Sequence, residues 1–116
     1  MSDFLDKSIS HNLWKSRLRD AIQGGEIPDE DITGSDNLCD IGKWIYGEGI
    51  VYQSLPEFQN LKSNHAGFHK EAANIIRTLK TGDKTKAMKE LESGEFANIS
   101  VRVILALKKL STKITK

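Results

Sequence analysis

The chain contains a single cysteine, Cys39, and this scarcity excludes an intrachain disulfide. Any chemistry at Cys39 is therefore that of a thiol, a thiolate or a metal ligand. The sequence also lacks the run of roughly 18 to 20 apolar residues that a transmembrane helix needs. Its N-terminal segment, MSDFLDKSIS, lacks the cationic start and apolar stretch of a signal peptide. We therefore expect a cytoplasmic protein without membrane insertion.

The chain also lacks a large excess of positive or negative charge. The chain has 17 lysine and arginine residues against 16 aspartate and glutamate residues, a formal net charge of +1. Such a balance supplies no strong field for collecting nucleic acid or anionic lipid, so we expect no nucleic-acid partner. A length of 116 residues suits one domain with one core, and we treat residues 1–116 as a single domain.

Only two prolines are present, and β-branched residues do not alternate with polar ones over any long window. The chain is therefore predicted to be all-α, an antiparallel four-helix-type bundle with one short extra helix. The first part of the chain is expected to comprise a helix from about Ser2 or Asp3 to Gln23, a loop from Gly24 to Asp36, and a short helix from Cys39 to Tyr46, capped by Ser35 or Asp36.

The third helix has the clearest predicted start. Ser54 and Glu57 form a Ser-x-x-Glu capping box with Pro56 in the first turn, and the helix should end near Gly82. Its apolar stripe carries two histidines and comprises Phe58, Leu61, His65, Phe68, His69, Ala72, Ile76 and Leu79.

The last helix is expected to run from after Asp83 to about Lys113. We expect it to continue through Gly94, although glycine costs about 1 kcal/mol relative to alanine there and favours a kink or break. Between Ile99 and Leu107 it is apolar around most of its circumference, more than one core-facing stripe requires. Because symmetric dimers are the commonest oligomers, we infer a homodimer in which this helix packs on its two-fold mate.

His65 and His69 are four positions apart, which places both imidazoles on one helical face with Cβ atoms about 5 to 6 Å apart. Two such imidazoles can converge on one ion. His11, on the apolar stripe of the first helix, and Cys39 could complete a tetrahedron of three nitrogens and one sulfur, a set that suits Zn²⁺.

An ordinary structural interpretation competes with this one. A histidine on an apolar stripe is more often a satisfied core residue than a ligand, and this applies to His11 taken alone. A free cysteine such as Cys39 commonly acts as a small buried hydrophobe. The pair His65 and His69 fits that interpretation less well, because two neutral imidazoles in a small core would each need hydrogen-bond partners. Spacing alone does not connect Cys39 to the histidines.

Three motifs, HNLW at 11–14, CDIGKWIYGEG at 39–49 and HAGFH at 65–69, together resemble the chemoreceptor zinc-binding domain family, abbreviated CZB. The middle motif is the most specific, with Gly42, Trp44, Tyr46, Gly47 and Gly49 following the cysteine. The resemblance continues from about residue 8 to residue 110. It implies that the ligands are His11, Cys39, His65 and His69.

The resemblance further implies a helical bundle, usually dimeric, attached to bacterial chemotaxis receptors or diguanylate cyclases. In that setting, zinc occupancy or oxidation of the cysteine changes the output of the attached domain. No receptor coiled coil or cyclase domain accompanies the motifs here, so the output partner is open. The chain is either a free-standing member or a piece of a longer protein, and Met1 with a helix following at once favours the former.

Four ligands would fill a closed sensory or structural site, and the residues between the two histidines of HAGFH cannot act as a base, so we expect no enzyme. Three competing roles are considered beside a redox sensor: a reporter of free zinc, a hemerythrin-like di-iron carrier, and a dimerisation module in which the metal is only a staple. A di-iron site needs more histidines and inward carboxylates than this chain supplies. Residues expected to support the site are Trp14, Trp44 and Phe68 as walls, or ordinary core aromatics, and Asp40 as an imidazole partner or a first-turn residue.

Overall fold

The computed structural model of the chain describes residues 13–114, and within that range it contains helices and loops but no strand. The predicted all-α class is confirmed. Residues 13–22 are helical, and they are followed by α2 (Glu30–Gly34), α3 (Asp40–Tyr46), the 3₁₀ helix η1 (Glu48–Tyr52), α4 (Pro56–Lys80), α5 (Lys84–Ser93) and α6 (Glu95–Ile114). The predicted start of the first helix lies outside the described residues.

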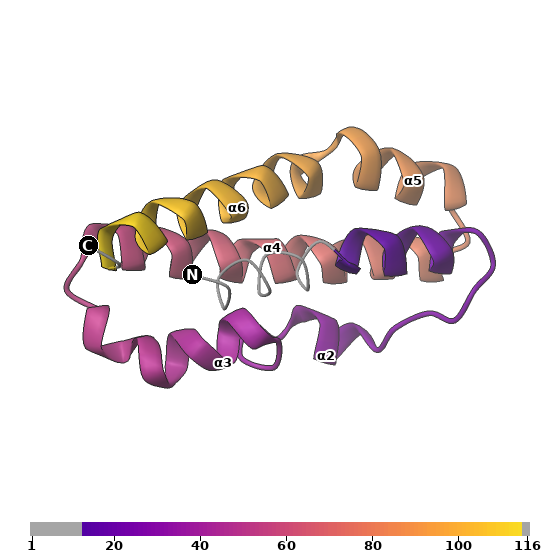
Figure 1. Cartoon of the computed structure of the whole chain (residues 1–116). Coiled ribbons are helices and arrows are strands. Elements are labelled where there is room, and N and C mark those ends of the chain that lie inside the picture. Colours follow the sequence, from indigo (N-terminus) through magenta and orange to yellow (C-terminus); the bar gives the residue numbers. More distant parts are fainter. Residues whose placement is uncertain (1–12, 115–116) are drawn as a thin grey trace.

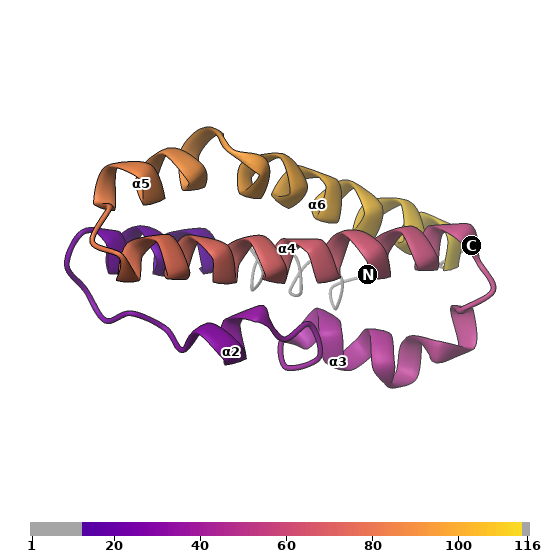
Figure 2. The same ribbon diagram turned by 180° about the vertical axis from the view of Figure 1, so that it is seen from behind.

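The long helix α4 is the axis of the bundle. In Figure 1, α5 and α6 lie along one side of α4, and α2 and α3 lie along the other. Figure 2 shows the same arrangement from behind. The turn into α5 places Gly82 at φ +91°, a left-handed conformation that favours glycine. The expected end of this helix near Gly82 is therefore confirmed, and α4 is antiparallel to the α5–α6 arm.

The core follows the apolar stripe of α4. All eight residues predicted to line that stripe are buried, including both histidines. On the α6 side, the ring centroids of Phe68 and Phe96 lie 4.9 Å apart. A Cβ added to Gly67 would lie 2.5 Å from Ile99 Cδ1, so the absence of a side chain lets α6 approach α4 closely.

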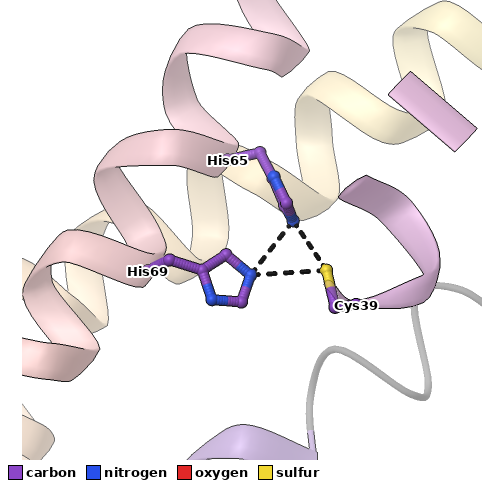
Figure 3. Close-up of side chains that lie close together, drawn as sticks. All are labelled: Cys39, His65 and His69. Carbon is purple, nitrogen blue, oxygen red and sulfur yellow. Dashed lines mark hydrogen bonds between the residues drawn. The ribbon is translucent and has the colours of Figure 1, made fainter. Parts of the chain in front are cut away.

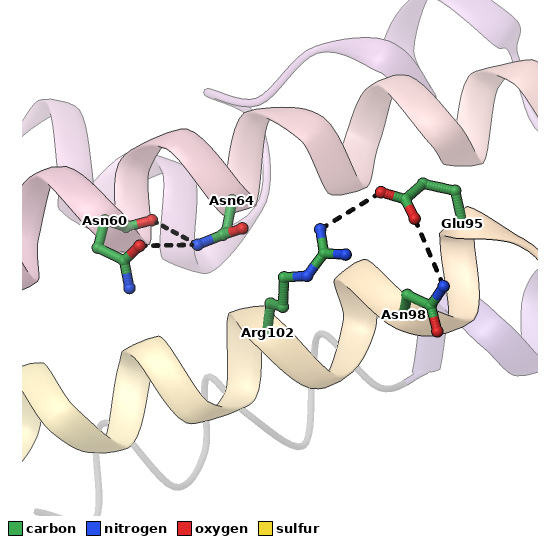
Figure 4. Close-up of polar contacts among 5 residues, drawn as sticks. All are labelled: Asn60, Asn64, Glu95, Asn98 and Arg102. Atoms are coloured by element: carbon green, nitrogen blue, oxygen red, sulfur yellow. Dashed lines mark hydrogen bonds and ion pairs between the residues drawn. The ribbon is translucent and has the colours of Figure 1, made fainter.

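Polar contacts on the surfaces of α4 and α6 connect turns of the same helix (Figure 4). Asn64 Nδ2 donates to the Asn60 carbonyl at 2.9 Å, and Arg102 Nη1 lies 3.3 Å from Glu95 Oε2. About half of each side chain in the Arg102–Glu95 ion pair is exposed, so it contributes little to stability. The packing of α6 on α4 therefore rests on their buried apolar side chains.

The prediction that residues 24–36 form only a loop is wrong, because α2 occupies Glu30–Gly34. Asp29 caps this short helix, its side chain accepting a hydrogen bond from the Ile32 N–H at 2.9 Å. Arg77 and Lys80 of α4 form ion pairs with Glu30. A five-residue helix has too little periodicity to detect in sequence, and tertiary contacts with α4 stabilise it.

Both predicted N-caps are also corrected. The N-cap of α3 is Cys39 itself, and neither Ser35 nor Asp36 occupies that position. The N-cap of α4 is Leu55, without a side-chain hydrogen bond, so the Ser54–Glu57 capping box does not form. Pro56 explains the second error, because its ring disfavours the helical conformation at the preceding residue. Leu55 is accordingly extended, with ψ 132°.

The prediction of a continuous last helix is wrong as well. Gly94 ends α5 with an extended backbone, at ψ −163°, and α6 begins at Glu95. Glycine loses the most conformational entropy in a helix, so a break costs least at this position. The break reorients the chain, and both Leu91 before it and Phe96 after it are fully buried.

The expected excess of apolar surface on α6 is present. Val101 and Leu105, one helical turn apart, are 59% and 51% exposed, while Val103 and Leu107 are buried. No helix within residues 13–114 combines the length and the apolar character needed to cross a bilayer.

Candidate metal centre

Three of the four predicted ligands meet between α3 and α4. His65 and His69 occupy successive turns of α4 and are 0% and 1% exposed. Cys39 lies at the N-terminus of α3 and is partly buried. Figure 3 shows the two imidazoles and the sulfur pointing toward one another from these two elements. The fourth predicted ligand, His11, lies outside the described residues.

The distances among the donor atoms are short. Cys39 Sγ lies 3.0 Å from His65 Nε2 and 3.4 Å from His69 Nε2, and the two Nε2 atoms lie 3.2 Å apart. Zinc–ligand bonds of about 2.05 Å to nitrogen and 2.3 Å to sulfur place tetrahedral ligands about 3.3 to 3.6 Å apart. The three atoms therefore form one face of a slightly contracted zinc tetrahedron, and the donor set fits the metal.

A hydrogen bond sets the tautomer of His69. Its Nδ1 atom lies 2.9 Å from the backbone carbonyl oxygen of Thr33 in α2. Because a carbonyl only accepts, Nδ1 carries the proton and donates it. The Nε2 atom of His69 is left with a lone pair directed at Cys39 and His65, the form that a metal requires.

Burial keeps both imidazoles neutral. Burial first and the neighbouring His69 second lower the pKa of His65 to about 3, and the charge of Asp36 opposes the shift. Burial also lowers the pKa of His69, against the hydrogen bond to Thr33 and the charge of Asp36. At neutral pH neither ring carries a proton on both nitrogens, so the pair can act as metal ligands without first losing a proton.

The backbone around Cys39 directs its sulfur at the histidines. The Gly42 N–H donates to Cys39 Sγ at 3.4 Å, inside the first turn of α3. A Cβ on Gly42 would lie 1.9 Å from the carbonyl oxygen of Asp36, so only glycine allows the preceding loop to pack this closely. Burial raises the pKa of the Cys39 thiol, and the helix N–H groups only partly offset this effect. Without a cation the residue is therefore a thiol at neutral pH.

Comparison with known families matches residues 11–76 to the chemoreceptor zinc-binding domain. The match covers more than half of the 116 residues and includes all four predicted ligands. The chain belongs to this family. Comparisons with curated proteins and with solved structures gave no match. The match ends at Ile76, so the predicted continuation of the resemblance to about residue 110 stays a prediction.

The supporting residues expected for this zinc-binding domain have different positions. The rings of Trp14 and Phe68 approach His69 edge-on, with centroids at 5.8 and 5.3 Å. Trp44 stacks on Tyr52 at 6.0 Å and lies 6.1 Å from Phe58. Trp14 and Phe68 therefore contact the predicted ligand His69, and Trp44 packs against the neighbouring aromatic residues.

Asp40 is the first residue of α3 and lies next to Cys39. Burial is the largest cause of the raised pKa of the Cys39 thiol, and the charge of Asp40 raises this pKa by a smaller amount. The imidazole of His69 instead uses the Thr33 carbonyl. Sequence reasoning missed this carbonyl, because the short helix that carries Thr33 was not predicted. The only sequence signal was Asp29, a capping residue three positions before Ile32.

A cleft of about 300 Å³ lies beside the cluster of Cys39, His65 and His69. Its walls include Trp14, Ile32 and Leu38, and both Cys39 and His69 line it. The guanidinium of Arg17, which also lines the cleft, lies over the Trp14 ring at 5.0 Å. Cys39 therefore lies at the wall of this cleft.

Proposed function

We propose that the chain is a zinc-binding sensory or regulatory domain of bacterial signal transduction, and not an enzyme. The observation that carries the proposal is the convergence of Cys39, His65 and His69, whose donor atoms lie within 3.4 Å of one another. Membership of a zinc-binding family and the nitrogen and sulfur donors both favour Zn²⁺ over harder ions.

His11 is proposed as the fourth ligand, because the family match begins at that residue. Three imidazoles and one thiolate would close the coordination shell and leave no position for the activated water of a hydrolase. A closed site suits a role in which gaining or losing the ion changes the fold. Zn²⁺ would also join segments that lie far apart in the sequence and stabilise the bundle.

Cys39 is proposed as the redox-sensitive ligand. Metal binding would keep its sulfur a thiolate despite the burial that raises the thiol pKa. The cleft between Trp14 and Leu38 gives small oxidants access to this residue. Oxidation to sulfenic acid would weaken the bond to the metal, and the change would reach a chemotaxis receptor or a diguanylate cyclase in the cytoplasm.

A reporter of free zinc is the second candidate for the same site. It predicts a structural response to Zn²⁺ without any oxidant. A di-iron carrier is disfavoured, because within residues 13–114 the single cluster with metal-ligand geometry contains two histidines, one cysteine and no carboxylate. If the chain is a dimerisation module whose metal only stabilises the fold, removing the metal with a chelator should leave partner binding unchanged.

Elemental analysis with an oxidation series tests the proposal. We expect about one zinc per chain, and low equivalents of peroxide or hypochlorous acid should release it from wild type. The Cys39→Ser variant is first titrated with zinc, which it should bind more weakly than wild type does. After it has been loaded with zinc, the oxidant should release no metal from it. Equal release from both proteins, or none from wild type, would reject the redox role, and two irons per chain would reject the zinc site.

A further inference from the structure

Two exposed apolar side chains line the cleft beside the predicted metal centre. Ile32 and Leu38 are 57% and 49% exposed, and they line the same cleft as Cys39. They come from different elements, Ile32 from α2 and Leu38 from the loop before α3, and neither belongs to the hydrophobic core. Single exposed apolar residues are common on protein surfaces, but these two meet at the cleft that also contains the single cysteine of the chain.

The charges of the cleft do not favour an ion. Arg17 and Asp40 are the lining residues that carry charge at neutral pH, and their charges are opposite. The Arg17 guanidinium already lies over the Trp14 ring, 5.0 Å from its centroid. A cleft without net charge supplies little field for attracting an anion or a cation. An uncharged molecule with an apolar group therefore suits this cleft best.

Cys39 is the donor of the cluster that such a molecule can reach. His65 and His69 are 0% and 1% exposed, whereas Cys39 is only partly buried and lines the cleft. We propose that the cleft selects organic hydroperoxides, with their apolar group against Ile32 and Leu38 and their peroxide group at Cys39. This inference rests on the proposed redox role of Cys39 and names the class of oxidant.

The reaction at Cys39 is a two-electron oxidation. The thiolate sulfur attacks the terminal oxygen of the hydroperoxide, so that an S–O bond forms while the O–O bond breaks. The sulfur is oxidised to sulfenic acid, and the peroxide is reduced to an alkoxide that takes a proton from water and leaves as an alcohol. Hydrogen peroxide reacts by the same step with hydroxide as the leaving group. A comparison of the two oxidants therefore isolates the effect of the apolar group.

The experiment uses the zinc-loaded chain with cumene hydroperoxide and with hydrogen peroxide. Rate constants are measured for zinc release and for sulfenic acid at Cys39, which is trapped and quantified by mass spectrometry. The ratio of the cumene hydroperoxide rate to the hydrogen peroxide rate is compared with the same ratio for N-acetylcysteine, which has no cleft. We expect the ratio for the chain to be about tenfold higher, because burial of the apolar group in the cleft favours the organic oxidant.

Two variants and a control test the apolar wall. Ile32→Gln and Leu38→Gln should each lower the rate ratio about threefold and leave the hydrogen peroxide rate within about twofold of wild type. Val51→Gln changes an apolar residue of η1 that is 78% exposed and does not line the cleft, so it should leave the ratio unchanged.

The outcomes separate this inference from the proposed function. A wild-type ratio no higher than that of N-acetylcysteine, or an unchanged ratio in both glutamine variants of the cleft, would overturn the selection of organic hydroperoxides. The redox role would still stand if hydrogen peroxide released zinc through Cys39. A chain that bound no Zn²⁺, or that kept its zinc in the presence of both oxidants, would overturn the proposed redox role together with this inference.

Discussion

The His69 Nδ1 atom donates a hydrogen bond to the Thr33 carbonyl oxygen at 2.9 Å, across 36 positions of sequence. This bond connects the metal-binding face of α4 to α2. The ion pairs of α2 with Arg77 and Lys80 are partly exposed, whereas the hydrogen bond to His69 is buried. The same imidazole therefore orients a ligand nitrogen and anchors a short helix that has little stability of its own.

Zinc should raise the thermal stability of wild type, and His69→Leu should abolish the increase. A ligand at 100 times its Kd stabilises the folded state by about 2.7 kcal/mol. For a domain of this size that corresponds to an increase in Tm of roughly 10 °C. Circular dichroism melts with buffered zinc and with a chelator measure the difference. An equal increase in His69→Leu would show that zinc binds elsewhere.

Acid should destabilise the metal-free chain through His65. In the folded state burial lowers the pKa of His65 from 6.5 to about 3, so the unfolded chain takes up the proton first. The stability contributed by the neutral ring is present above pH 6.5 and is lost as pH falls toward 3. Urea unfolding at pH 7 and pH 5 should show a smaller free energy of unfolding at pH 5. His65→Leu should reduce this difference, and an unchanged difference would contradict the assignment.

Gly42→Ala should disrupt the site more than a matched change inside the HAGFH motif. At Gly42 the new Cβ meets the backbone carbonyl of Asp36, whereas at Gly67 it meets the tip of the Ile99 side chain, which can rotate away. Overpacking against backbone costs about 1 to 3 kcal/mol or more and would displace Cys39. We expect Gly42→Ala to lose most of its zinc affinity and Gly67→Ala to lose less. Chelator competition and urea unfolding compare the two, and the reverse order would be inconsistent with this packing.

A homodimer through α6 remains a prediction, supported by the exposure of Val101 and Leu105. Sedimentation at micromolar concentration should show a dimer, and Leu105→Glu should shift it toward monomer by burying an unpaired charge in the interface. Lys86→Glu, a charge change at an exposed position of α5, serves as the control. A wild-type monomer with and without zinc would remove the dimer from the account.

The apolar stripe of α4 could be predicted from the sequence because eight positions repeat at helical spacing over a helix of 25 residues. The same stripe placed His65 and His69 on one buried face. Cys39 could not be connected to them by spacing, because the contact depends on how the loop before α3 folds back. That fold-back rests on the Asp36 carbonyl against Gly42, a close approach between backbones that has no periodic signal.

The errors have different physical causes. At Leu55 the steric effect of the following proline outweighed the capping preference of Ser54. At Gly94 the low helix propensity of glycine outweighed the apolar periodicity on both sides. In α2, contacts with α4 stabilise a helix too short to be recognised by itself. Local preferences of single residues therefore decided where α4 begins and where α5 ends, whereas tertiary contacts decided that α2 is helical.

X-ray absorption of the zinc-loaded chain tests the central claim most directly. Three nitrogen neighbours at about 2.0 Å and one sulfur at about 2.3 Å are the predicted result. Cys39→Ser should lose the sulfur contribution and keep the nitrogen shell. A zinc spectrum of wild type without sulfur would contradict the convergence of Cys39 with His65 and His69 on one ion.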